Sequence, residues 1–153
     1  MSDTTDRNPL NRNPRILALM AHLGSDPDDY DIFDVAAYDE TTIEDGRDEY
    51  LVLTDTEADT LARERAESDL WAFNTSFLCG YIPALRNNRA ADAFAKMQGS
   101  LCEDAGDLIA AMLGDNLDRC IDDAVSCDGR AHFLASYDGY EYEAQGYYIF
   151  RVN

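Results

Sequence analysis

Lysine is nearly absent from this sequence, and basic side chains as a whole are scarce. Lys96 is the only lysine, and 12 basic residues stand against 31 acidic ones, so the formal net charge is −19. A surface this negative repels phosphate groups, which excludes direct nucleic-acid binding by the folded domain and disfavours an anionic membrane or substrate. We therefore expect cationic partners.

Long apolar runs, paired cysteine motifs and glycine-rich phosphate loops are also missing. No stretch approaches the roughly 20 apolar residues of a membrane span, and the N-terminal residues lack a signal-peptide core, so we expect a cytoplasmic protein. The four cysteines include no Cys-x-x-Cys pair, and the Asp-rich segment 26–34 lacks the Gly and Glu that an EF-hand loop requires. We expect no metal site and no cofactor.

What the chain does have is enough apolar material for a core. Apolar residues make up 46% of its 153 positions, and this length fits one domain. Residues 1–15 contain two Asn-Pro pairs and no periodic apolar face, so we expect a flexible polar tail there. Residues 16–153 are expected to form a single acidic α+β domain.

Hydrophobic periodicity predicts a helix-dominated fold with a small antiparallel sheet of about three strands. The expected strands are 41–44, 47–54 and 147–152, and Asp45-Gly46 is typical of a two-residue hairpin turn. Helices are expected over 15–23, from residue 54 to about 73, and over 88–98, 101–113 and 115–126. Thr54 and Glu57 fit a capping box, and segment 26–33 fits either a helix or an extended strand.

The apolar positions predict which helix faces are shared. Ala62, Ala66, Leu70 and Phe73 form one stripe, and the helix over 101–113 has an apolar face of Leu101, Ala105, Leu108, Ile109 and Met112. We expect Trp71, Phe73 and Phe77 to belong to the core, and Cys79 and Cys120 to be small buried thiols.

No catalytic signature stands out, so we expect a protein that is not an enzyme. The one cluster that could carry chemistry is His132 with Tyr137 and Asp138 near the C-terminal turn. These residues could form a hydrogen-bonded site, or His132 could serve to fix the turn. The sequence leaves both interpretations open.

The acidic side chains are concentrated in two regions. Residues 26–69 hold 17 acids and 3 bases, and residues 103–143 hold 11 and 2. Asp115, Asp118 and Asp122 follow the i, i+3, i+7 spacing of one helix side, which places carboxylates on the order of 5–6 Å apart, like neighbouring phosphates. The candidate partner-binding residues are Asp104, Asp107, Asp115, Asp118, Asp122, Asp123, Glu57, Asp59, Glu64 and Glu67.

Three stretches carry a resemblance to a known group of proteins. They are Tyr50-Leu-Val-Leu-Thr-Asp-Thr-Glu-Ala-Asp59, Asp69-Leu-Trp-Ala-Phe-Asn74 and Asp128-Gly-Arg-Ala-His-Phe-Leu-Ala-Ser-Tyr-Asp-Gly139. Together they resemble small uncharacterised acidic accessory proteins of bacteriophages and mobile elements, over roughly residues 41–152. The resemblance implies no catalytic residue. It implies a context in which short accessory proteins inhibit host defence, and very acidic ones imitate the charge of DNA.

Charge and resemblance together predict an inhibitor of a host defence system, anti-CRISPR or anti-restriction, that acts as an acidic DNA mimic. Its expected partner is a basic nucleic-acid-binding protein of the host, such as a defence nuclease or effector complex. The alternative is a salt-adapted or accessory acidic protein without groove binding, either a small enzyme that uses the His132 region or a phage assembly component. The scarcity of lysine fits a salt-loving source or a high-GC genome equally well.

Overall fold

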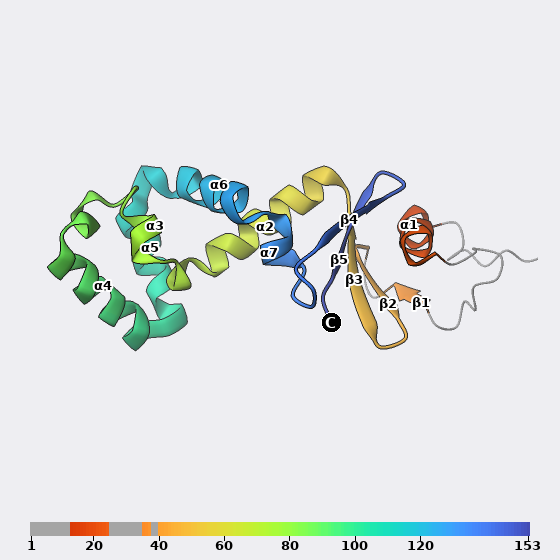
Figure 1. The fold of residues 1–153 in the computed structure, drawn as a ribbon, viewed down its shortest axis with the longest axis horizontal. Coiled ribbons are helices and arrows are strands. Elements are labelled where there is room, and N and C mark those ends of the chain that lie inside the picture. The colour runs from red at the N-terminus through yellow and green to blue at the C-terminus, as the bar shows by residue number, and fades with distance from the viewer. Residues whose placement is uncertain (1–12, 25–34, 38–39) are drawn as a thin grey trace, which may run out of the picture. The chain divides into compact units, whose positions relative to one another are not determined.

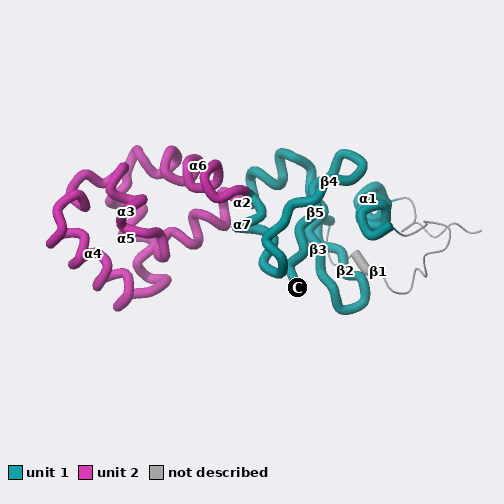
Figure 2. Tube along the Cα trace, viewed as in Figure 1, with its two compact units in different colours: residues 1–61, 130–153 teal, residues 62–129 magenta. Residues whose placement is uncertain are grey.

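The computed structural model describes residues 13–24, 35–37 and 40–153. It confirms a helix-dominated α+β fold with an antiparallel sheet. Its contacts group into two compact units, unit 1 with residues 1–61 and 130–153, and unit 2 with residues 62–129 (Figure 2). The single domain expected over 16–153 stays a prediction. Residues 1–12 of the tail expected over 1–15, and the segment 26–33, lie outside the described residues. The expectation is wrong for residues 13–15, because the Asn13 side chain caps a helix that begins at Pro14, and Arg15 is buried.

The sheet of unit 1 has five strands where about three were expected, in the order β1-β2-β3-β5-β4 (Figure 1). The strands are β1 (Val35–Ala37), β2 (Thr42–Asp45), β3 (Asp48–Leu53), β4 (Glu141–Ala144) and β5 (Tyr147–Arg151), and all neighbours are antiparallel. The three predicted strands are the adjacent β2, β3 and β5, and β3 lies at the centre of the sheet. The sequence did not predict β4, because its acidic, exposed residues have little strand propensity.

The two hairpins of the sheet use different turns. The loop between β2 and β3 is Gly46-Arg47, because Asp45 pairs with Asp48, so the predicted Asp45-Gly46 turn is wrong by one residue. Gly46 has a φ of 62°, which suits the first loop position of a type II′ turn. Between β4 and β5, Gln145 (φ 51°) and Gly146 (φ 80°) are both left-handed, as a type I′ turn requires.

Helices cover both faces of this sheet. Helix α1 (Pro14–Leu23) is capped by the side chain of Asn13 and ends at Gly24, whose φ is 72°. Its apolar side packs on one sheet face in a cluster of Ile16, Ala18, Leu19, Met20, Ile43, Tyr50, Val52 and Ile149. The alternate strand residues Leu51, Leu53 and Phe150 are buried on the opposite face, where Figure 1 places α7 (Arg130–Leu134). Because both faces of β3 are buried, consecutive residues of this strand are apolar and do not alternate with polar ones.

Unit 2 is built of short helices. Helix α2 (Asp55–Ser68) begins in unit 1 and continues into unit 2. The elements that follow are η3 (Leu70–Ala72), α3 (Thr75–Leu78), η4 (Pro83–Arg86), α4 (Asn88–Leu101), η5 (Cys102–Asp104), α5 (Ala105–Leu113), η6 (Gly114–Asn116) and α6 (Leu117–Asp128). Ala62, Ala66 and Leu70 are buried as predicted, whereas Trp71, Phe73 and Phe77 are only partly buried.

The same backbone joint occurs twice in unit 2. After α4, Cys102 has φ 49° and ψ −127°, and after α5, Gly114 has φ 53° and ψ −124°. Each is followed by a short 3-10 turn and then a new helix. This conformation favours glycine, because a Cβ crowds the backbone there, so only one of the two joints carries the residue that the geometry prefers.

Acidic residues face one another across β2 and β3, and this arrangement is testable. Glu44 lies directly opposite Glu49, and in the described part of the chain neither has an ion-pair partner. We expect Glu49→Lys to raise the free energy of unfolding by about 0.5–1 kcal/mol at low salt, because it replaces a repulsive cross-strand pair with an attractive one. Urea denaturation at low and at molar salt would measure this, and the gain should shrink with salt.

Glu143→Lys is the matched control for this change. Glu143 lies on β4 opposite Tyr148, so the charge changes by the same amount without a carboxylate across the strand. An equal gain in both variants would mean that net charge, and not the Glu44–Glu49 pair, sets the effect.

Candidate functional site

A long acidic stretch lies in unit 2. Residues 103–128, called the acidic segment below, hold eight Asp and Glu residues and a single basic residue, Arg119. Seven of the eight acids are exposed, and the eighth, Asp123, is partly buried. The segment includes six of the ten residues predicted from the sequence to bind a partner.

The expected ladder of Asp115, Asp118 and Asp122 does not lie on one helix. Helix α5 ends at Gly114, whose positive φ starts a 3-10 turn, so Asp115 lies in η6 and only the other two lie on α6. Arg63 of α2 pairs with Asp122, and its Nη2 lies 3.9 Å from Asp118 Oδ1. Two of the three carboxylates therefore already share a cation, although the side chain of Asp118 remains 91% exposed.

Asp123 has a structural role. The hydroxyl of Tyr81 donates to Asp123 Oδ2 at 2.5 Å, and Asn116 Nδ2 donates to the carbonyl of Tyr81 at 3.2 Å. Burial and the hydrogen bond to Asp123 raise the pKa of Tyr81 to about 12. The guanidinium of Arg119 lies 5.1 Å from the centre of the Tyr81 ring. These contacts join the loop before η4 to α6. Asp123 is therefore already engaged within unit 2 and is not a free partner-binding carboxylate.

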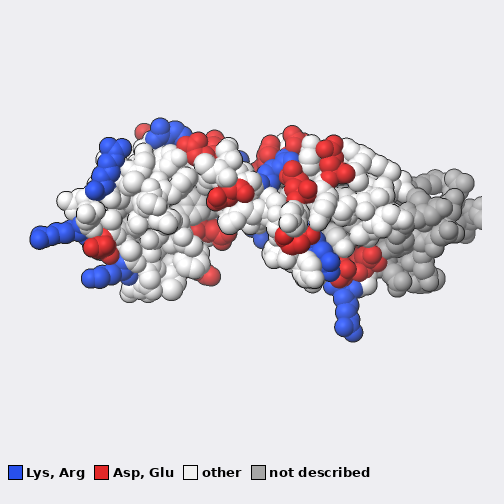
Figure 3. All heavy atoms as spheres, in the orientation of Figure 1, with Lys and Arg blue, Asp and Glu red and all other residues white. Residues whose placement is uncertain are grey.

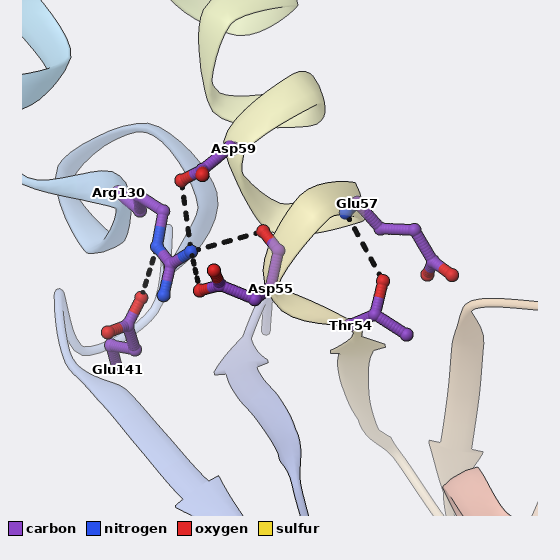
Figure 4. Close-up of polar contacts among 6 residues, drawn as sticks. All are labelled: Thr54, Asp55, Glu57, Asp59, Arg130 and Glu141. Carbon is purple, nitrogen blue, oxygen red and sulfur yellow. Dashed lines mark hydrogen bonds and ion pairs between the residues drawn. The ribbon is translucent and has the colours of Figure 1, made fainter.

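Glu57 is held inside unit 1 by Arg15. Arg15 Nη1 donates to Glu57 Oε2 at 2.7 Å and to the carbonyl of Val52 at 2.7 Å, and its Nη2 donates to Glu57 Oε1 at 2.6 Å. Arg15 is buried, with 9% of its surface exposed. Glu57 N also donates to Thr54 Oγ1 at 3.3 Å, which confirms the predicted helix cap (Figure 4). Glu57 thus fastens α1 and β3 to α2.

Asp59 belongs to a second arginine-centred cluster in unit 1. Figure 4 shows Asp55, Asp59 and Glu141 converging on Arg130, whose side chain is 14% exposed. Nη1 donates to Asp55 Oδ1 at 2.8 Å and Asp59 Oδ1 at 3.0 Å, and Nε donates to Glu141 Oε1 at 2.8 Å. Burial lowers the pKa of Arg130, but the hydrogen bonds to the carboxylates outweigh it and raise the pKa overall. Asp59 therefore links α2 to β4.

Five of the ten predicted residues remain exposed and, within the described chain, without a cationic partner. Glu64 and Glu67 lie on the part of α2 that belongs to unit 2, Asp104 and Asp107 lie in η5 and α5, and Asp115 lies in η6. A partner can reach these five without breaking an internal ion pair, as it can the exposed Asp69, Asp92, Glu103 and Asp128 of unit 2. Sequence spacing alone does not separate them from the other five.

Unit 2 also carries a basic region. Arg86 of η4 and Arg89 and Lys96 of α4 are exposed. Figure 3 shows blue Lys and Arg side chains projecting from the part of unit 2 where Figure 1 places α4, with red Asp and Glu side chains among them and over the rest of the visible face. Unit 2 therefore carries exposed basic side chains as well as acidic ones.

The apolar face predicted for residues 101–113 is divided in the structure. Ala105, Ile109 and Leu113 are buried, whereas Leu101, Leu108 and Met112 are 42%, 46% and 43% exposed. The joint at Cys102 interrupts the helix, so the spacing counted across it does not hold. Leu108 and Met112 lie one turn apart on α5 and form an exposed apolar surface that sequence periodicity assigns to the same face as the core residues.

The cluster expected around His132 does not form in the described residues. His132 is exposed on α7 and packs edge-on against Phe133, with ring centroids 4.8 Å apart. Asp138 instead accepts from the amide of Tyr140 at 3.0 Å and the hydroxyl of Tyr142 at 3.3 Å, while Tyr137 lies against Arg151. Asp138 therefore shapes the turn before β4.

Other possible sites are poorly equipped for chemistry. A hollow of about 300 Å³ is lined by Trp71, Ala72, Gln98 and Gly99, but the Gln98 amide already donates to the carbonyls of Trp71 and Phe73. Cys120 is buried, which raises the pKa of its thiol to about 11. Across residues 13–24, 35–37 and 40–153, no three His, Cys, Asp or Glu side chains are grouped so that they could hold a metal.

The described helices and the comparisons with known proteins add two findings. Among the helices that the structure describes, none is both long enough and apolar enough to cross a membrane. The chain matches no protein-family model, no curated protein and no solved structure. The phage resemblance stays a prediction, and the candidate surface rests on the geometry of unit 2.

Proposed function

We propose that this protein is a phage-type inhibitor of a host defence system, anti-CRISPR or anti-restriction, that acts in the host cytoplasm. It binds a basic nucleic-acid-binding protein, and its carboxylates take the place of phosphates in the groove of that protein. It has no catalytic role in this proposal. The exposed acids of unit 2, and not the whole predicted set, are the contact residues.

One observation carries the proposal. In the acidic segment, seven exposed carboxylates stand against Arg119, and Asp104, Asp107 and Asp115 have no cation beside them in the part of the chain that the structure describes. Like charges held this close destabilise the folded state, so their presence in the acidic segment favours a use in binding. A groove lined with Arg and Lys offers the counter-charges, and binding by many such pairs weakens with salt.

The test is affinity capture from host lysate with the native protein, followed by measurement of the captured protein's affinity. We expect elution by salt and by competing duplex DNA. The triple variant Asp104→Asn, Asp107→Asn, Asp115→Asn should bind about tenfold or more weakly, with a smaller salt dependence, because three charge pairs are lost. Fluorescence anisotropy over a salt series would measure both quantities.

The matched control removes the same charge from unit 1. Glu44→Gln, Glu49→Gln, Glu143→Gln changes the net charge equally on strands β2, β3 and β4. An equal loss of affinity in both triple variants, or a partner that DNA does not displace, would contradict groove mimicry through unit 2.

The facing carboxylates of Glu44 and Glu49 favour the alternative, a salt-adapted protein, because molar salt screens such repulsion. That alternative predicts a fold that needs molar salt. The inhibitor predicts a fold that is stable at low salt. Circular dichroism during dialysis into low-salt buffer separates the two.

A further inference from the structure

The outer face of α5 joins apolar and acidic side chains in one surface. Leu108, Ala111 and Met112 are exposed and follow the i, i+3, i+4 spacing of a single helix face; we call them the α5 stripe. Asp107 precedes the stripe by one residue, Asp104 lies one turn before Leu108, and Asp115 follows α5 in η6. The adjacent side of the helix, with Ala105, Ile109 and Leu113, is buried.

The stability of α5 does not account for the whole surface. Asp104 and Asp107 lie near the helix N-terminus, where negative charge favourably meets the helix dipole. Leu108 and Met112 are buried only in part, because each keeps more than two-fifths of its surface in water, and burying that remaining apolar surface would be favourable. Two large apolar side chains one turn apart, on a helix whose neighbouring carboxylates have no cation in the described chain, form a surface suited to a partner.

Charge decides which partner this surface fits. A second copy placed face to face would bring the carboxylates of both α5 helices together, and their repulsion opposes that contact. A partner helix with an apolar stripe and flanking Lys or Arg would cover Leu108 and Met112 and pair with Asp104, Asp107 and Asp115. Methionine suits such a role because its flexible side chain adapts to different apolar surfaces.

We infer that the α5 stripe docks a basic amphipathic helix of the partner protein, with Leu108 and Met112 as the apolar anchors and the neighbouring carboxylates as its charged rim. The inference rests on the proposed function in requiring a cationic partner, and adds to it an apolar contact that phosphate mimicry alone does not need. A partner helix that binds in this way carries apolar anchor residues at positions i, i+3, i+4 and i+7.

The experiment uses two synthetic helical peptides of about 18 residues and equal charge. One contains Leu at i, i+3, i+4 and i+7 in an Ala-rich sequence with Lys at flanking positions, and the other has Gln in place of every Leu. Isothermal titration into the full chain should show the Leu peptide binding at least about tenfold more tightly. Leu108→Gln with Met112→Gln should bring the two affinities together, while the control Tyr140→Gln, another exposed residue, should leave the difference intact.

Each result has one meaning. Equal binding of both peptides by the native protein, or a difference that survives in the Leu108→Gln, Met112→Gln variant, overturns the docking inference and leaves charge-based inhibition standing. Absence of binding by either peptide at low salt contradicts the inference and the proposed function together. Self-association in sedimentation that the same double variant abolishes would show that a second copy covers the stripe, which also overturns the inference.

Discussion

Replacing Arg15 with Met should lower the free energy of unfolding by about 2–3 kcal/mol. The substitution keeps the apolar stem but removes three hydrogen bonds of 2.6–2.7 Å, one to Val52 and two to Glu57. It leaves the Glu57 carboxylate without its cation. Because that carboxylate is 35% exposed, solvent keeps the loss below that of a fully buried pair. Urea denaturation at pH 7 measures the difference.

A double-mutant cycle provides the control for this prediction. Glu57→Gln removes the unpaired charge, so the Arg15→Met, Glu57→Gln variant should be more stable than the sum of the single changes predicts. Arg47→Met, at an exposed turn position, should change stability little. Strict additivity in the cycle would mean that Arg15 stabilises the fold through packing and the Val52 carbonyl alone.

The same ion pair gives a pH dependence with a definite sign. The hydrogen bond to Arg15 lowers the pKa of Glu57 below its ordinary value of 4.5, although burial opposes this. The folded state therefore binds this proton less readily than the unfolded chain does, and the stabilisation is complete above about pH 4.5 and is lost as pH falls through the lowered pKa. The native protein should lose more stability than Glu57→Gln over that interval. Parallel loss in both proteins would contradict the assignment.

Replacing Cys102 with Gly should stabilise the protein, by about 1 kcal/mol or more. Cys102 has φ 49° and ψ −127°, a conformation that a residue with a Cβ adopts only under strain, and its side chain is exposed. Glycine adopts it freely, and the relief exceeds the extra chain entropy that glycine brings to the unfolded state. Thermal and urea denaturation under reducing conditions measure the gain.

Gly114 supplies the reverse experiment at nearly identical geometry. A Cβ at Gly114 would meet no atom within 4 Å, so Gly114→Ala tests the backbone conformation without a steric clash from neighbouring elements. We expect a loss similar in size to the gain from Cys102→Gly. Destabilisation by both substitutions would show that the Cys102 side chain, whose Sγ donates to the carbonyl of Gly99 at 3.5 Å, outweighs the strain.

Local signals predicted most of the fold. The boundaries of α1, the strands β2, β3 and β5, and the Thr54–Glu57 cap all depend on residues within a few positions of one another. The hairpin turn was displaced by one residue because Gly46 can serve at either position of a two-residue turn, and only the pairing of Asp45 with Asp48 decides.

The candidate site was harder to predict, because its carboxylates differ in partners that are distant in the sequence. Arg15 reaches Glu57 across 42 positions, Arg63 reaches Asp122 across 59 and Arg130 reaches Asp55 across 75. Sequence spacing shows which acids share a helix face but not which of them an arginine already occupies. Likewise, periodicity grouped Leu108 with Ile109, but the width of the face that the core covers depends on the packing of neighbouring helices.

The order of the units along the chain bears on how the protein is made. β3 pairs with β5, for example through Tyr50 and Arg151, and all of unit 2 lies between these two strands in the sequence. During synthesis the β2–β3 hairpin therefore forms before β5 exists, and the hydrogen-bonding edge of β3 stays unpaired until β5 is made. An open apolar edge invites pairing between nascent chains. The facing carboxylates of Glu44 and Glu49 repel the same hairpin of another chain, so a repulsion that weakens the finished sheet would protect it from aggregation while it is incomplete.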